Sequence, residues 1–375
     1  MNPDAALSAL SASLHEEGPA VEILPGTTGN DYLANEVPGS ELVGMEGIAA
    51  VVRTSGSTGT PKRTALSVDA LASSSMATAE YLGFEGQWLL PLPIHFVAGL
   101  AVLTRSLYAG TRPWAMDLEQ SFSSRGFNEA ASALTDRRRL VSMVPTQLQR
   151  LLTDPDAQTI ATLQRFDAIL LGGARAPQAV LEEASKHSLK LHLTYGSSET
   201  AGGCVYDAKA LPGVQVKVVD GRIMLGGPTI ASGYLRDAEL TAKHFTVDGS
   251  GVRWYATDDL GSYTDGVLSV TGRADDVIIT GGVKVSAAQV QRIVEALPGV
   301  SAAAVVPVTD AQWGQQIGAA YVGSAGPESL AAAVRESLGA AAVPRRMQRL
   351  EALPLLPNGK IDRMLLASLL AEASD

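Results

Sequence analysis

The sequence contains very little cysteine. Cys204 is the only cysteine among 375 residues, so no disulfide bond can form within the chain. We therefore expect a protein of a reducing compartment, the cytoplasm. A lone cysteine is more often a small buried apolar side chain than a reactive thiol, and we predict burial for Cys204.

Positive charge is also scarce. The chain has 29 lysines and arginines against 39 aspartates and glutamates, and its formal net charge is −10. This excess of acidic residues argues against nucleic acid or an anionic membrane as the main partner. A small anionic molecule can still bind locally, through a few basic side chains and backbone N–H groups.

No long uninterrupted hydrophobic run is present. The most apolar window, residues 89–110, is broken by Pro91, Pro93, His95 and Arg105. An arginine inside a membrane-spanning helix would be costly, so we predict that this window is buried protein structure and not a membrane span. The first 18 residues lack the basic and apolar regions of a signal peptide, and we expect none.

The composition and the order of the predicted elements favour a large folded protein of the α/β class. Hydrophobic residues make up 46% of the chain, and its length suits two or three domains. In the first half, apolar strand patterns alternate with helical patterns, which predicts a layered α/β domain. The strands are expected at 48–54, 139–144, 167–171 and 189–194, and helices at 68–82 and 177–187.

The pattern changes after about residue 205, where short strands with tight turns follow one another. Further on, a helix is predicted at 286–297 with Ser286 as its N-cap, followed by strands at 301–308 and 317–322. These elements indicate a small α+β domain. We place the boundary after Arg273, with a large N-terminal domain over 1–273 and a small C-terminal domain over 274–375.

The segment TSGSTGTPK at 54–62 is a candidate phosphate site, because it directly follows a predicted strand. A glycine-rich turn in that position can point several backbone N–H groups at a phosphate, and a lysine adds charge. The segment does not match the P-loop pattern, since Gly56 and Gly59 are three residues apart and Pro61 precedes Lys62. From these residues alone, a phosphate loop and a flexible linker remain equally open.

Five motifs together resemble the adenylate-forming superfamily of acyl- and aryl-CoA ligases, luciferases and adenylation domains. They are TSGSTGTPK at 54–62, YGSSET at 195–200, WYATDDLG at 254–261, GRADDVIITGGVKVS at 272–286 and LPNGKIDR at 356–363. The resemblance implies that a carboxylic acid and ATP form an acyl-adenylate and pyrophosphate, and that coenzyme A then displaces AMP. It also implies that the small C-terminal domain is a mobile lid that swings about a hinge at Asp275.

The resemblance implies catalytic roles for three residues. Lys360 would bridge the attacking carboxylate and the α-phosphate, where charge develops in the transition state. Glu199 would hold Mg²⁺ beside the phosphates, and His95 would guard the reacting carboxylate. The alternatives are an exposed lysine for Lys360, a surface ion pair for Glu199 and an ordinary buried histidine for His95.

The nucleotide site follows from the same resemblance. Tyr195 would lie along adenine, although core packing is an alternative, and Asp259 would bind the ribose hydroxyls. The sequence departs from the family where Asp258 and Arg63 replace the usual glycines. The full set of predicted nucleotide-binding residues is Thr54, Ser55, Gly56, Ser57, Thr58, Gly59, Lys62, Tyr195, Gly196, Ser198, Asp259 and Arg273.

The predicted acyl-substrate residues are His95, Arg105, Gly172 and Gly173. A buried arginine needs an anionic partner. For Arg105 that partner is either a second carboxylate on the substrate or an acid of the protein, and the sequence leaves both open. These residues, together with SGYL at 232–235, resemble the o-succinylbenzoate–CoA ligase branch of menaquinone biosynthesis.

We therefore predict an ATP-dependent CoA ligase for an aromatic acid, o-succinylbenzoate before others. The small-molecule partners would be ATP, the acid, coenzyme A and Mg²⁺, and the sequence is compatible with a homodimer. One alternative is another aryl- or acyl-CoA ligase, or a stand-alone adenylation enzyme. Another is a non-catalytic nucleotide-binding homologue, against which the presence of Lys360 and Glu199 argues.

Overall fold

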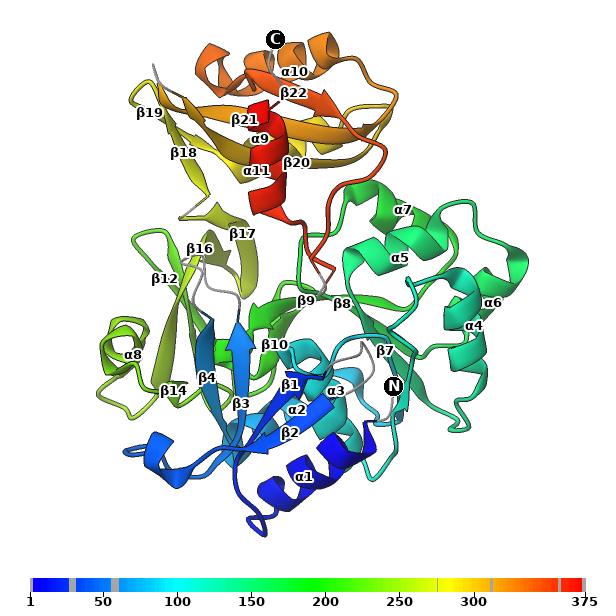
Figure 1. Cartoon of the computed structure of the whole chain (residues 1–375), viewed down its shortest axis with the longest axis vertical. Coiled ribbons are helices and arrows are strands. Elements are labelled where there is room, and N and C mark those ends of the chain that lie inside the picture. The colour runs from blue at the N-terminus through cyan, green and yellow to red at the C-terminus, as the bar shows by residue number, and fades with distance from the viewer. Residues whose placement is uncertain are drawn as a thin grey trace.

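The computed structural model describes residues 3–26, 32–54, 61–274, 276–310, 313–356 and 359–372. Within these ranges it combines four β-sheets with surrounding helices, which confirms the predicted α/β class (Figure 1). Short 3₁₀ helices η1, η2 and η3 span Gly39–Glu41, Ser198–Thr200 and Ala340–Ala342. In the described part of the chain, no helix is long and apolar enough to cross a membrane.

The first sheet contains the strands on either side of the TSGSTGTPK segment. Across the sheet, the order is β14 (Gly233–Tyr234), β4 (Lys62–Ser67), β3 (Ile48–Thr54), β1 (Val21–Pro25) and β2 (Tyr32–Glu36). Strand β3 lies where a strand is predicted at 48–54. It runs antiparallel to β4, and Thr54 is the register partner of Lys62.

The second sheet is mostly parallel and forms the centre of the large unit. Its order is β11 (Lys209–Ala210), β10 (Gly202–Tyr206), β9 (Leu191–Ser197), β8 (Ala168–Leu171), β7 (Arg139–Met143), β5 (Gln87–Leu90) and β6 (Trp114–Ala115). Strand β9 continues three residues beyond the predicted 189–194, because β10 turns back and pairs with residues 194–197.

Helices cover both faces of this sheet, as the alternation of buried side chains along its strands requires. Trp88, Leu140 and Leu170 belong to one core cluster, whereas Leu89 and Val141 belong to another. Helices α1 (Asp4–Leu14), α2 (Val68–Leu82) and α3 (Val97–Tyr108) supply the first cluster. The second is supplied by α4 (Ser124–Ser132), α5 (Pro145–Leu152), α6 (Ala157–Gln164) and α7 (Gln178–Lys186).

The third sheet is antiparallel and is built from tight hairpins. Its strands are β12 (Gln215–Val219), β13 (Arg222–Gly226), β16 (Arg253–Thr264) and β15 (Phe245–Val247), with β17 (Val267–Arg273) on β16. Helix α8 spans Ala238–His244. The β12–β13 turn has positive φ at both central residues, 50° at Asp220 and 78° at Gly221, as a type I′ turn requires.

The fourth sheet belongs to the C-terminal unit and has its own core. Its strands are β19 (Val283–Ser286), β18 (Val277–Thr280), β21 (Gly314–Gly323) and β20 (Val300–Asp310), with β22 (Arg346–Arg349) on β21. Helices α9 (Ala287–Glu295) and α11 (Arg363–Glu372) pack against it, and α10 (Pro327–Leu338) packs against α9. The Ser286 hydroxyl accepts a hydrogen bond from Gln289 N, as predicted for an N-cap.

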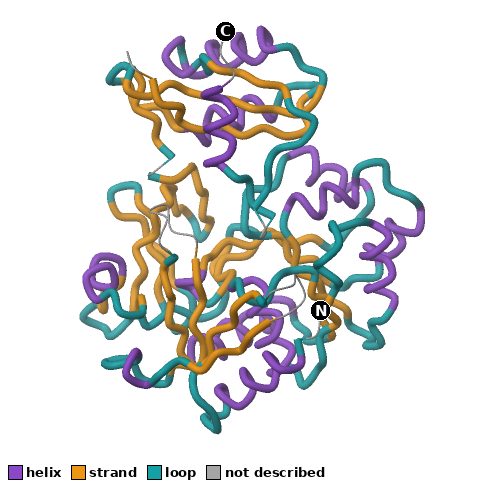
Figure 2. The backbone as a smooth tube through the Cα atoms, viewed as in Figure 1, coloured by secondary structure: helices purple, strands orange, loops and turns teal. Residues whose placement is uncertain are grey.

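Two segments of the chain run between the two units. Strand β17 ends at Arg273 in the third sheet and β18 begins at Val277 in the fourth; the boundary after Arg273 itself stays a prediction. The segment between β22 and α11 then runs from the C-terminal unit down toward β8 and β9 (Figure 1), almost entirely as loop (Figure 2). Its Gly359 carbonyl accepts a hydrogen bond of 3.1 Å from Thr146 Oγ1 at the start of α5.

Candidate active site

Lys360 lies where the connecting segment meets the large unit. A turn holds it, since Gly359 N donates to Leu356 O and Leu356 N donates to Lys360 O. A Cβ built on Gly173 would lie 3.9 Å from Lys360 Cε, so the side chain passes beside the end of β8. The residue is exposed, yet desolvation by neighbouring protein groups lowers the pKa of its ammonium group.

Charged groups from several motifs of the described structure act on Lys360. The charge of Arg273 further lowers its pKa, whereas Glu199 and Asp259 act in the opposite direction. The structure therefore brings together residues from the YGSSET, TDDLG, GRADD and LPNGK motifs. The lysine is within electrostatic range of both acids, as a group that acts on a bound nucleotide has to be.

Glu199 is a buried carboxylate on η2, directly after β9. Its Oε1 accepts a hydrogen bond of 2.8 Å from the Tyr234 hydroxyl, and its backbone carbonyl accepts one of 2.9 Å from Ala231 N. The next turn is fixed by Ala201, whose φ is 51° and whose carbonyl accepts a hydrogen bond from Ser74 Oγ. These contacts set the position of Glu199 within the buried end of the sheet.

Tyr195, Asp259 and Arg273 form a second group beside Glu199. The Tyr195 hydroxyl donates a hydrogen bond of 2.6 Å to Asp259 Oδ2, and Arg273 Nη1 lies 3.6 Å from Asp259 Oδ1. Asp259 and Arg273 are register partners on β16 and β17, which explains their approach. Burial, and then the neighbouring Asp259 carboxylate, raise the pKa of Tyr195, so this hydroxyl stays protonated and remains a donor.

Asp258, which replaces a usual glycine, pairs with two arginines through its carboxylate. Its Oδ1 accepts a hydrogen bond of 3.1 Å from Arg222, and its Oδ2 lies 3.8 Å from Arg273. Successive side chains of a strand point to opposite faces, but the register of β16 shifts just beyond this point. Asp258 therefore adds a second acid to Arg273 and leaves Asp259 bonded to Tyr195.

Arg63, the other departure from the family, lies within a network of acids. It pairs with Glu22 at 2.9 Å and with Glu41 at 2.5 Å, and Glu22 also accepts a hydrogen bond from Arg53. Lys62 precedes it on β4, so the two side chains leave the strand on opposite faces. The Lys62 Nζ lies 5.4 Å from the centroid of the Tyr234 ring, and the bulk of Arg63 is directed to Glu22 instead.

Arg105 of α3 is buried, with a fractional exposure of 7%. Its Nη2 donates a hydrogen bond of 3.1 Å to the Tyr206 hydroxyl, and its guanidinium lies 5.4 Å from the Trp88 ring. Among the residues that the structure describes, Arg105 forms no ion pair with a protein acid, and its buried Nε has no hydrogen-bond partner. The protein-acid alternative for its partner therefore has no support in the described structure.

His95 and the two predicted pocket glycines lie near the ends of the parallel strands. Burial lowers the pKa of His95, so its imidazole is neutral at physiological pH, and its Nδ1 has no partner in the described structure. A Cβ on Gly172 would lie 2.2 Å from Thr194 Oγ1. Gly173 has a φ of 82°, a conformation that favours glycine.

Gly196 and Ser198 occupy the end of β9 and the start of η2. A Cβ on Gly196 would lie 2.1 Å from the Gly202 carbonyl oxygen, so the close β9–β10 pairing requires glycine there. Ser198 is buried beside Glu199. Thr54 and Lys62 lie at the ends of β3 and β4, whereas the predictions for Ser55, Gly56, Ser57, Thr58, Gly59 and Asp275 fall outside the described residues.

Sequence reasoning missed two tyrosines of this region. Tyr234 hydrogen-bonds Glu199, and its only signal is its place in the SGYL segment. Tyr206 contacts Arg105 and Thr78 through its hydroxyl, and no motif points to it. Both tyrosines are fully buried, and the partners of their hydroxyl groups are distant in the sequence.

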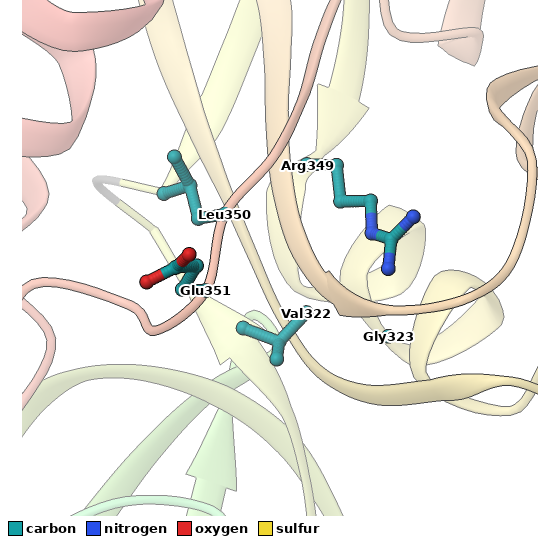
Figure 3. A pocket seen from close by; sticks show the side chains of 5 residues that line it. All are labelled: Val322, Gly323, Arg349, Leu350 and Glu351. Atoms are coloured by element: carbon teal, nitrogen blue, oxygen red, sulfur yellow. The ribbon is translucent and has the colours of Figure 1, made fainter.

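A separate hollow lies on the C-terminal unit at the ends of β21 and β22 (Figure 3). In the close-up, the Arg349 side chain extends away from that of Glu351, and Leu350 lies beside Glu351. The hollow contains none of the predicted site residues. We therefore assign the site to the groups around Lys360 and not to this hollow.

The two-part α/β fold and the motif residues gathered around Lys360 agree with the adenylate-forming class of enzyme. The chain belongs to the family of AMP-binding enzymes: the family model described as AMP-binding enzyme matches residues 6–235, and the one described as AMP-binding enzyme C-terminal domain matches residues 289–360. The predicted membership of the adenylate-forming superfamily is thus confirmed.

Comparison with individual relatives shows which members of this family the chain is similar to. The chain is 38% identical over 378 residues to a probable 2-succinylbenzoate–CoA ligase of Mycobacterium tuberculosis, covering 98% of this chain and 96% of the relative. It also resembles the solved structure of the o-succinylbenzoate CoA synthetase MenE of Bacillus subtilis in complex with OSB-AMP, with a TM-score of 0.68 and 27% identity, over 85% of this chain and 69% of that one. The amide bond synthetase McbA of Marinactinospora thermotolerans matches with a TM-score of 0.73 and 28% identity, over 92% and 74% of the two chains.

Proposed function

We propose that the protein is an AMP-forming acid–thiol ligase that joins o-succinylbenzoate to coenzyme A, a step of menaquinone biosynthesis. The observation that carries this proposal is the match to the Mycobacterium tuberculosis relative, which extends over nearly the full length of both chains. The relatives confirm the predicted ligase class, and the site contains the acids and the lysine that the first half-reaction needs.

In the first half-reaction, a carboxylate oxygen of the acid attacks the α-phosphorus of ATP, and the bond to pyrophosphate breaks. Lys360 would lie between the two anionic reactants and stabilise the charge that develops as they approach. Support comes from its place within electrostatic range of Glu199 and Asp259, on a segment that reaches the large unit from the C-terminal unit. In the second half-reaction, the thiol of coenzyme A attacks the acyl carbon and AMP leaves.

The nucleotide would be held by the group around Tyr195. Asp259 would accept hydrogen bonds from the ribose hydroxyls and Tyr195 would lie along the adenine ring. Thr54 and Lys62, at the ends of β3 and β4, would contact the phosphates. Arg273 would act near the ribose and the α-phosphate, in keeping with its pairing to Asp259.

Glu199 would be the protein ligand for Mg²⁺. The described residues contain no cluster of three or more acids, histidines or cysteines that could hold a metal by themselves. One buried carboxylate fits Mg²⁺ nevertheless, because this ion is commonly held by one or two carboxylates together with substrate phosphates and water. The ion would supply charge neutralisation at the phosphates.

The acid would enter beside α3 and the end of β8. Its reacting carboxylate would lie near His95, which is neutral and therefore adds no competing positive charge. Its second carboxylate would pair with Arg105, which supplies a buried guanidinium without an ion pair to a protein acid in the described structure. Gly172 and Gly173 would allow backbone close to the aromatic ring.

The proposal is tested by incubating purified protein with ATP, Mg²⁺, coenzyme A and one acid at a time. The panel is o-succinylbenzoate, benzoate, salicylate, acetate and a medium-chain fatty acid, with thioester formation and pyrophosphate exchange measured. Thioester formed from o-succinylbenzoate alone supports the proposal. Turnover of a different acid refutes the proposed substrate, and absence of exchange with every acid favours the non-catalytic alternative.

A further inference from the structure

Tyr234 connects two groups of the site that come from different elements, Glu199 of η2 and Lys62 of β4. Its hydroxyl donates a hydrogen bond of 2.8 Å to Glu199 Oε1, and Lys62 Nζ lies 5.4 Å from its ring centroid. The pairing of β14 with β4 explains this, because Tyr234 is the register partner of Thr64 (Figure 1). Lys62 is two residues from Thr64, on the same face of β4, so the lysine is a diagonal neighbour of the tyrosine ring.

The protein holds the Tyr234 side chain firmly in this place. The residue is 1% exposed, and its ring packs edge-on against Phe245 at 5.3 Å and against His244 at 6.1 Å. Its backbone N–H donates to Thr241 Oγ1 at 2.9 Å. The direction of the hydroxyl is therefore set by packing against α8 and β15, and not by solvent.

The side chain of Glu199 needs a hydrogen-bond donor such as Tyr234 if its carboxylate is to keep a single orientation. Its backbone is fixed by Ala231 and by the η2 turn, but a glutamate side chain still has several rotamers. A hydrogen bond from Tyr234 to Oε1 selects a rotamer and so sets the direction of the other carboxylate oxygen. Carboxylates that bind metals are commonly oriented in this way by a donor behind them.

We propose that Tyr234 is a positioning residue, which orients the Glu199 carboxylate toward the metal–ATP complex and keeps Lys62 beside it. This inference rests on the proposed function, since it takes Mg²⁺·ATP as the ligand of Glu199 and Lys62. It assigns to the tyrosine of SGYL a role in metal-dependent binding, beyond its packing in the core.

The test is the substitution Tyr234→Phe, which removes one hydroxyl and keeps the ring beneath Lys62. ATP affinity is measured by calorimetry with Mg²⁺ present and again in EDTA, and the ratio of the two affinities gives the metal enhancement. We expect this enhancement to fall roughly tenfold in Tyr234→Phe, as for loss of a hydrogen bond to a charged group. The affinity in EDTA should stay close to that of the unsubstituted protein.

Two further variants show whether Tyr234 acts through Glu199. Tyr255→Phe removes another hydroxyl of the same buried aromatic cluster, for which the described structure gives no hydrogen bond to Glu199, and should keep the full metal enhancement. Glu199→Gln should abolish it. Adding Tyr234→Phe to Glu199→Gln should then cause no further loss, because coupled residues are not additive.

A Tyr234→Phe protein with lower thermal stability but full metal enhancement would show that Tyr234 has only a packing role. Equal losses in Tyr234→Phe and Tyr255→Phe would also overturn the inference, as would a lack of metal enhancement in the unsubstituted protein. Because binding is measured, failure of the proposed acid remains distinguishable: it would leave metal-dependent ATP binding in place while no o-succinylbenzoate is consumed.

Discussion

Replacing Arg105 with methionine tests the proposed recognition of a dicarboxylate. Arg105→Met keeps an apolar stem beside Trp88 and removes the guanidinium. The arginine is 7% exposed and pairs with no protein acid in the described structure. Its loss therefore leaves no protein carboxylate buried without a partner, and we expect only a small change in the free energy of unfolding.

The effect on the substrate should be much larger. A hydrogen bond to a charged group contributes about 1.5–3 kcal/mol, which corresponds to an increase of about 10-fold to 150-fold in the KM for o-succinylbenzoate. The KM for ATP should stay nearly constant, because Arg105 contacts Tyr206 and Trp88 and none of the predicted nucleotide residues. Both KM values can be measured by pyrophosphate exchange.

Arg63→Met is the matched control. Arg63 is also largely buried, with 23% of its side chain exposed, but it pairs with Glu22 and Glu41. Its loss should therefore lower the free energy of unfolding and leave the KM for the acid unchanged. If Arg105→Met leaves the KM for o-succinylbenzoate unchanged, or raises the KM for ATP equally, Arg105 does not bind the second carboxylate.

The remaining predictions concern Lys360 and Glu22. Lys360→Ala should abolish adenylate formation while largely sparing thioester formation from supplied adenylate; equal loss in both half-reactions, measured separately, would refute its role. Since burial lowers the pKa of Lys360 and its protonated form is the active one, adenylation should decline with rising pH below the usual lysine range of about 10.4, which a pH profile of pyrophosphate exchange would reveal. Glu22→Gln should lower the free energy of unfolding by about 2–3 kcal/mol, since two arginines lose their shared acid but Arg53 is half-exposed. Burial raises the pKa of Glu22, but its two arginines outweigh this and the net pKa is lowered, so its stabilisation is full above the unfolded pKa and is lost as pH falls through the folded one. Denaturant titrations should accordingly show the gap between Glu22→Gln and the unsubstituted protein closing in acid, and a gap independent of pH would contradict the assignment.

Much of the fold could be predicted because its signals are local. The 48–54 run is apolar and β-branched and became β3, and Ser286 caps α9 as its side-chain chemistry predicts. The end of β9 could not be predicted in this way. Residues 195–197 are part of strand β9 because they pair with β10. This pairing depends on the glycines at 196, 202 and 203 and not on strand propensity.

Local sequence could also identify most candidate residues, because each motif carries its own chemistry. Asp259 and Arg273 are an example: their motifs suggested a shared nucleotide site, and the register of β16 and β17 places them side by side. The contacts of Asp258 and Arg63 could not be predicted in the same way. Two of their partners, Arg222 and Glu22, are distant in the sequence and carry no motif, and the motif residue Arg273 approaches Asp258 only through the pairing of β16 and β17.

The amino-acid sequence by itself determined the family, the α/β class, the reaction type and the identity of the charged groups, since these depend on residue types at short spacings. Only the tertiary structure decided which of those groups meet. It placed Lys360 within electrostatic range of Glu199 and Asp259, left Arg105 without an ion pair to a protein acid in the described structure, and brought Tyr234 to Glu199. Such contacts arise from strand pairing and packing between segments far apart in the chain, and no short stretch of sequence contains both partners.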